Sequence, residues 1–143
     1  KRASQRASGG GPKRHMKPLD GASRLVSWTI QWSLAQTDAP VIKDARLLIA
    51  ADCSAFASTS ISEFIKGRVV LIGCPKLDES QPFLEKLTEI LRSNDIREIT
   101  VLHMEVPCCS NLVRLVSQAI RESGKDIPLQ KFICMINGST AKE

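Results

Sequence analysis

The middle of the chain reads Arg68-Val69-Val70-Leu71-Ile72-Gly73-Cys74-Pro75. Four apolar residues run together there without alternation, which is typical of a strand buried on both faces, as in a parallel sheet covered by helices. Pro75 has no N–H to give to a neighbouring strand, so we expect the strand to end near Cys74. The stretch therefore predicts a thiol at the carboxyl end of a buried strand, where open α/β sheets bind their ligands.

Two further apolar runs also end in cysteine. The first, residues 47–51, leads to Cys53, and the second, residues 99–106, leads to the adjacent pair Cys108 and Cys109. The carboxyl ends of parallel strands lie at one edge of their sheet. We therefore expect three strands to deliver four cysteines to the same edge.

Segments with helical character separate the apolar runs. A capping-box spacing at residues 60–63 predicts a short helix, and residues 83–91 keep their apolar side chains at helical spacing. Ser110 is a plausible N-cap for a third helix, which Gly124 should end. With a last strand over residues 132–136, the order from residue 46 is β-α-β-α-β-α-β. This order predicts an α/β fold of three layers, α/β/α, with a mainly parallel sheet of about four strands.

An alternating pattern precedes these elements. Apolar side chains at every second position of residues 26–34, Trp28 and Trp32 among them, predict a half-buried N-terminal edge strand. The two tryptophans could form a stacking surface, but such a stripe more often packs on the core. We therefore expect both rings to lie against the sheet.

The first 22 residues differ from the rest in composition. Residues 1–18 hold six of the 20 lysines and arginines and no acid, so residues 19–143 balance 14 basic against 15 acidic side chains. We interpret 1–22 as a basic disordered tail or linker, with an exposed His15, and 23–143 as a single domain. The near-neutral domain offers no argument for nucleic-acid binding. No apolar run is long enough to span a membrane. Because the chain starts with Lys1, we interpret it as a fragment or a processed chain.

The cysteines are five in number: Cys53, Cys74, Cys108, Cys109 and Cys134. An odd number in a domain with a good core is not a disulfide framework, and it favours a reducing, cytoplasmic environment. Four thiolates are the usual ligands of a [4Fe–4S] or [2Fe–2S] cluster or of structural zinc. The spacing Cys-x20-Cys-x33-Cys-Cys lacks the Cys-x2-Cys pair that would make the signal diagnostic. We expect Cys134 to be a core residue.

Two other interpretations of the edge cysteines stay open. Cys108 and Cys109 precede a helix whose N-terminus would lower a thiol pKa, which suits thiol redox chemistry. All four could instead be inert, because free cysteine is often buried. The nearby His103 could tune the site, although a satisfied core histidine is commoner. The sequence holds no Walker A loop, no G-x-G-x-x-G fingerprint and no G-x-S-x-G elbow.

Three motifs together resemble the C-terminal domain of bacterial and archaeal ferredoxin-like iron–sulfur proteins. They are Leu-Ile-Ala-Ala-Asp-Cys at 48–53, Ile-Gly-Cys-Pro-Lys at 72–76 and Met-Glu-Val-Pro-Cys-Cys at 104–109, and the likeness covers roughly residues 24–138. In that family an N-terminal module with two Cys-x2-Cys-x2-Cys-x3-Cys-Pro runs precedes the domain. Those runs are missing here, and the basic tail stands in their place.

The resemblance implies an iron–sulfur electron-transfer function. Cys53, Cys74, Cys108 and Cys109 are the positions that carry across as ligands of a [4Fe–4S] cluster, with zinc as the alternative metal. We expect an electron carrier or oxidoreductase component rather than a stand-alone enzyme, and we assign no catalytic residue. Its partner would be a redox protein or an adjoining ferredoxin module. The alternatives are a thiol redox or sulfur-carrier protein using Cys108 or Cys109, and a non-catalytic docking domain.

Overall fold

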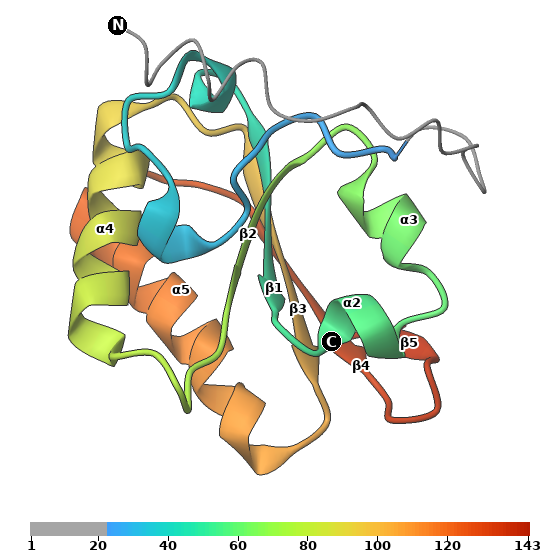
Figure 1. The fold of residues 1–143 in the computed structure, drawn as a ribbon. Helices are drawn as coiled ribbons and strands as arrows, with labels where there is room; N and C mark the ends of the chain where they lie inside the picture. Colours follow the sequence, from blue (N-terminus) through green and yellow to red (C-terminus); the bar gives the residue numbers. More distant parts are fainter. Residues whose placement is uncertain (1–22) are drawn as a thin grey trace, which may run out of the picture.

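A five-stranded sheet forms the centre of residues 23–143, the part of the chain that the computed structural model describes (Figure 1). The strand order is β2-β1-β3-β4-β5, in which the first four strands are parallel and β5 is antiparallel to β4. This confirms the predicted α/β class with a mainly parallel sheet. The strands are β1 (Arg46–Ala51), β2 (Val69–Gly73), β3 (Glu98–Met104), β4 (Leu129–Cys134) and β5 (Thr140–Lys142).

Helices cover both faces of the sheet. The long helices α4 (Ser80–Ser93) and α5 (Ser110–Ser123) lie on one face, and the short helices α2 (Ser54–Ala57) and α3 (Ile61–Ile65) lie on the other (Figure 1). The layers are therefore α/β/α, with one thick and one thin helical layer. No helix within residues 23–143 is both long and apolar enough to span a membrane. The predicted tail, residues 1–22 with His15, lies outside the described residues.

The core lies around β1 and β3, the strands with neighbours on both sides. Leu47, Leu48, Ile99, Val101 and Leu102 are completely buried. Burial of each such side chain contributes about 1.5–3 kcal/mol, and the uninterrupted apolar runs supply side chains to both faces at once. The prediction of buried parallel strands from these runs is confirmed.

The N-terminal segment differs from its prediction. The alternating residues form no strand but touch the β2 edge at a single bridge between Gln31 and Ile72, where the Ile72 N–H donates to the Ile30 carbonyl at 2.7 Å. The 3₁₀ helix η1 (Trp32–Leu34) then turns the chain away from the edge. Trp32 is buried as expected, but Trp28 is 81% exposed, so only one of the two rings packs on the core.

Several boundaries also differ. Residues 54–57 form the short helix α2, and at its start the buried Ser54 hydroxyl donates to the Ala51 carbonyl at 2.7 Å. The capping box before α3 is not formed, since Ser60 makes no side-chain cap. Gly124 ends α5 with φ +75°, as predicted. The last parallel strand begins at Leu129 rather than at 132.

Candidate functional site

The carboxyl ends of β1 and β3 meet at a switch in chain direction. After β1 the chain crosses one face through α2 and α3 to β2, and after β3 it crosses the opposite face through α5 to β4 (Figure 1). Adjacent strands whose connections leave over opposite faces open a crevice at their carboxyl ends, where α/β proteins bind ligands. Here Asp52 and Cys53 follow β1, and residues 105–109 follow β3.

The structure places the predicted cysteines at this edge with different exposures. Cys53 and Cys108 are exposed, Cys74 is half-buried, and Cys109 is buried at the N-cap of α5. All have free thiols, as does Cys134, which is completely buried at the end of β4. Cys134 is therefore a core residue, as the sequence predicts.

Cys109 is the candidate ligand whose pKa is shifted by its surroundings. Burial raises the pKa of the Cys109 thiol, a hydrogen bond from the Met104 backbone opposes this, and the neighbouring Cys108 and Cys74 thiols raise it further. Cys74 follows β2, and Cys108 and Cys109 follow β3, so the three thiols belong to the same edge of the sheet. Cys53 is not among the groups that shift the Cys109 pKa.

The arrangement is not a complete metal site. Among residues 23–143, no group of three or more His, Cys, Asp or Glu side chains is placed so that it could hold a metal ion. The thiolate set still has the chemistry that iron–sulfur clusters and zinc require. The ligand roles of Cys53, Cys74, Cys108 and Cys109 therefore stay predictions.

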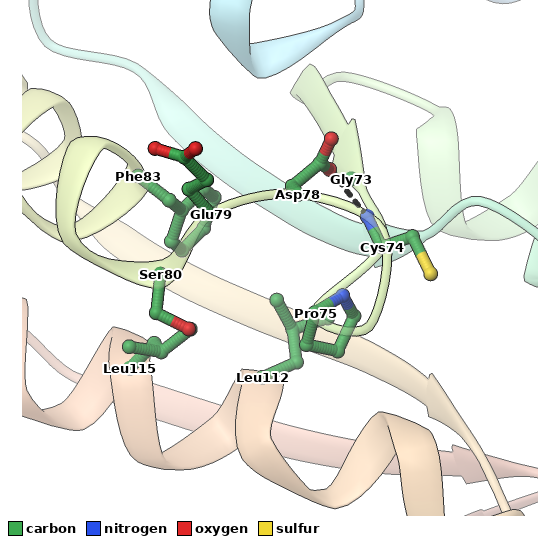
Figure 2. A pocket seen from close by; sticks show the side chains of 9 residues that line it. All are labelled: Gly73, Cys74, Pro75, Asp78, Glu79, Ser80, Phe83, Leu112 and Leu115. Atoms are coloured by element: carbon green, nitrogen blue, oxygen red, sulfur yellow. Dashed lines mark hydrogen bonds between the residues drawn. The ribbon is translucent and has the colours of Figure 1, made fainter.

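A hydrogen-bonded latch, formed by Trp32 and Asp78, holds the loop that carries Cys74. The Trp32 indole Nε1–H donates to Asp78 Oδ2 at 3.0 Å. The Cys74 backbone N–H donates to the same oxygen at 2.7 Å, and Figure 2 shows this second hydrogen bond. Gly73 makes room for the indole, because a Cβ there would lie 2.7 Å from Trp32 Cδ1. No local pattern indicates this latch, since Trp32 and Asp78 are 46 residues apart.

Beside the latch lies only a small cavity. Its volume is about 10 Å³, which admits roughly one water molecule and no organic ligand. Its lining joins the Cys74 loop to Phe83 of α4 and to Leu112 and Leu115 of α5. Figure 2 shows the Cys74 sulfur pointing away from the other labelled side chains. The thiol is therefore directed away from this cavity.

Two carboxylates beside the cysteines have separate surroundings. Burial raises the pKa of Asp52, the nearby Asp78 raises it further, and the Asp52 Oδ1 atom is buried without a hydrogen-bond partner. Glu105 accepts a hydrogen bond from the Ile136 N–H at 2.9 Å, so it fastens the β4–β5 hairpin.

His103 is a satisfied core residue. It is 6% exposed, its Nδ1 lies 3.1 Å from the Met104 carbonyl oxygen, and its Nε2 pairs with the Glu143 carboxylate. Both ring nitrogens are therefore occupied by groups other than the cysteines. This confirms the structural interpretation of His103 over a role in tuning the thiols.

Comparisons with known proteins assign the family. Residues 39–143 match a family described as "Rossmann-like domain". The chain is also 32% identical over 115 residues to an uncharacterized protein of Archaeoglobus fulgidus, covering 80% of this chain and 81% of that one. No solved structure matches. Neither match points to ferredoxin-like proteins, so that resemblance gains no support here. With its wound sheet and this match over most of its length, the chain belongs to the Rossmann-like domain family.

Proposed function

We propose that the chain is a domain of an iron–sulfur electron-transfer protein and that its edge thiols hold a cluster or another thiophilic metal. The observation that supports the proposal is that Cys74 follows β2 while Cys108 and Cys109 follow β3, so that all three thiols belong to the same edge of the sheet. That edge is where wound sheets bind their ligands.

The electrostatics of the three thiols suit a bound cation. Burial and two neighbouring thiols each disfavour the Cys109 thiolate, and this is the reason that its pKa is raised. A metal ion reverses that balance, because a coordinating thiol gives up its proton and the cation offsets the clustered negative charge. The arrangement is therefore costly for free thiolates and favourable for ligands.

Cys53 is the proposed fourth ligand. It lies across the switch point from Cys108, at the N-cap of the four-residue helix α2. Such a short helix is held by few backbone hydrogen bonds, so a small shift of this loop is inexpensive. Trp32 and Asp78 are positioning residues, since they hold the Cys74 backbone without touching the metal.

Metal analysis of the full chain tests this proposal. The protein is purified without oxygen, incubated with iron and sulfide or with zinc, desalted, and assayed for bound metal, sulfide and visible absorption. We expect uptake by the wild type and loss of uptake in Cys74→Ser, Cys108→Ser and Cys109→Ser. A loss of metal uptake in Cys53→Ser as well would show that the protein supplies all four ligands.

Cys134→Ala is the matched control, because Cys134 lies in the core at the end of β4. It should keep full metal uptake. The proposal fails if the wild type takes up neither iron nor zinc, or if Cys134→Ala loses metal to the same extent as the edge variants. Circular dichroism of each variant separates loss of the site from loss of the fold.

Thiol redox chemistry is the second candidate, and the contrast between exposed Cys108 and buried Cys109 favours it. Because its pKa is raised, Cys109 is a poor nucleophile at neutral pH, so Cys108 would attack. The Cys108 thiolate would displace one sulfur of a partner's disulfide, and Cys109 or Cys74 would then displace the other and leave a disulfide in this chain. Metal-free protein with one rapidly alkylated thiol would favour this candidate. Metal-free protein whose thiols are all alkylated slowly would instead favour a non-catalytic docking domain.

We also propose a cytoplasmic location for either function. All five thiols are free in the structure, and free thiols persist in reducing compartments.

A further inference from the structure

Four loops at the carboxyl ends of the parallel strands carry the edge thiols. These are residues 52–60, 74–79, 105–109 and 135–139, called here the carboxyl-edge surface. The Asp52 N–H donates to the Gly73 carbonyl at 3.0 Å, and the Thr59 N–H donates to the Gly138 carbonyl at 3.1 Å. Glu105 joins the third loop to the fourth through its hydrogen bond to Ile136. The loops are therefore held in fixed relation to one another.

Large apolar side chains stand exposed on this surface. Phe56 is 97% exposed, Leu77 is 82% exposed and Ile136 is 69% exposed, and each comes from a different loop. Exposure of one such side chain is ordinary, whereas three on the loops of one sheet edge favour an interaction surface. Cys53 and Cys108, the exposed thiols, belong to the same four loops.

Acidic groups predominate on the same surface. The four loops hold four carboxylates and a single lysine, Lys76: the acids are Asp52, Asp78, Glu79 and Glu105. Glu79 and Glu105 are exposed, while Asp52 and Asp78 are half-buried. A partner that presents lysines and arginines around an apolar centre would be complementary to this distribution.

We propose that the carboxyl-edge surface is the docking site of a redox protein with an apolar centre and a basic rim. This inference rests on the proposed function, because a partner that exchanges electrons with the edge thiols must approach them from this side. Phe56, Leu77 and Ile136 would make the apolar contacts, and the carboxylates would guide approach. Transient redox complexes bury little surface, so a small docking patch is sufficient.

Binding of cytochrome c, a basic redox protein, tests the docking surface directly. Its affinity for the full chain is measured by calorimetry at about 20 mM and about 150 mM salt, because screening weakens exposed charge pairs. We expect binding at low salt that weakens at high salt. A weakening of about tenfold is expected for Phe56→Ser combined with Leu77→Ser, since removal of central apolar contacts commonly costs more than 1 kcal/mol. Glu79→Lys should also weaken binding.

Trp28→Ser combined with Leu34→Ser is the matched control. Both side chains are large and exposed but lie outside the carboxyl-edge surface, so affinity should change less than about twofold. The docking inference is overturned if cytochrome c does not bind, if the control weakens binding equally, or if an acidic ferredoxin used as the opposite probe binds more tightly.

A second variant separates this inference from the proposed function. This variant has serine in place of all four candidate ligands, Cys53, Cys74, Cys108 and Cys109. It cannot hold a cluster, but it keeps Phe56, Leu77 and the acidic residues of the carboxyl-edge surface. It should still bind cytochrome c, and Phe56→Ser combined with Leu77→Ser should weaken that binding as it does in the wild type. Metal uptake by the wild type without cytochrome c binding would overturn the docking inference and leave the iron–sulfur function standing. Binding of cytochrome c that depends on Phe56 and Leu77, without any metal uptake, would overturn the iron–sulfur function and support the docking surface.

Discussion

Replacing Gly73 with alanine tests how the Cys74 loop is held. The new Cβ would lie 2.7 Å from Trp32 Cδ1 and 3.1 Å from Asp78 Oδ2. Because carbon atoms pack at about 3.5 Å or more, the indole must move by roughly 0.8 Å. That movement disturbs the hydrogen bond from Trp32 to Asp78 and the edge-on contact of Trp32 with Phe83, whose ring centroid lies 5.3 Å away.

The expected loss of stability follows from these contacts. Overpacking of a filled site costs about 1–3 kcal/mol, and a disturbed hydrogen bond to a charged acceptor adds up to about 1.5 kcal/mol. Alanine at an ordinary φ returns about 0.4–1 kcal/mol by restricting the unfolded chain. We therefore expect Gly73→Ala to lower the free energy of unfolding by about 2 kcal/mol. Alkylation of Cys74 should become faster as its loop loosens.

Urea denaturation followed by far-ultraviolet circular dichroism measures the change. Gly124→Ala is the control, because Gly124 has positive φ but no atom lies within 4 Å of the place that a Cβ would occupy, so only backbone strain of about 1 kcal/mol applies. In a Trp32→Ala background, Gly73→Ala should cost almost nothing, since the obstructing ring is gone. A cost below about 0.5 kcal/mol in the wild type, or an undiminished cost beside Trp32→Ala, would refute the steric reasoning.

Three further outcomes are expected. Thr100→Val should raise the free energy of unfolding by about 1 kcal/mol in urea titrations, because the Thr100 hydroxyl is buried without a hydrogen-bond partner; a loss of stability would argue against this. Burial and the nearby Glu105 raise the pKa of the Cys134 thiol in the folded protein above its value in the unfolded chain. The fold therefore keeps this contribution to its stability while the pH is below the unfolded-state thiol pKa, and loses it as the pH rises further. Wild type should therefore lose stability relative to Cys134→Ala as pH rises above about 8.5, and parallel pH profiles would contradict the shift. In metal-free native protein, mass spectrometry should show iodoacetamide on Cys53 and Cys108 at early times and on Cys134 only after unfolding; early labelling of Cys134 would show that the core opens.

The buried strands were predictable because their sequence pattern has one physical cause. Parallel strands covered on both faces need apolar side chains at every position, and residues 47–51 and 69–73 show that need directly. The helix that begins at Ser110 was recognisable from its apolar spacing and its closing Gly124. The edge position of Cys74 and Cys108 then followed from strand direction alone.

Other features depend on contacts that local patterns do not encode. Residues 26–34 alternate as a strand would, but the turn at η1 permits just one bridge to β2. The pairing of Trp32 with Asp78 joins distant segments and has no local signature. By contrast, the hairpin that brings β5 back onto β4 had a signal in Asn137-Gly138, where Gly138 has φ +99°.

The lone contact between residues 30–31 and Ile72 has a practical consequence for shortened versions of this protein. β2 is the outermost parallel strand, and this contact is what occupies its outward-facing backbone at Ile72. Removing residues 23–31 would leave an apolar strand with unsatisfied donors and acceptors open to solvent, and such strands recruit other chains. Truncated protein would then self-associate, and its insolubility could be mistaken for failure to fold.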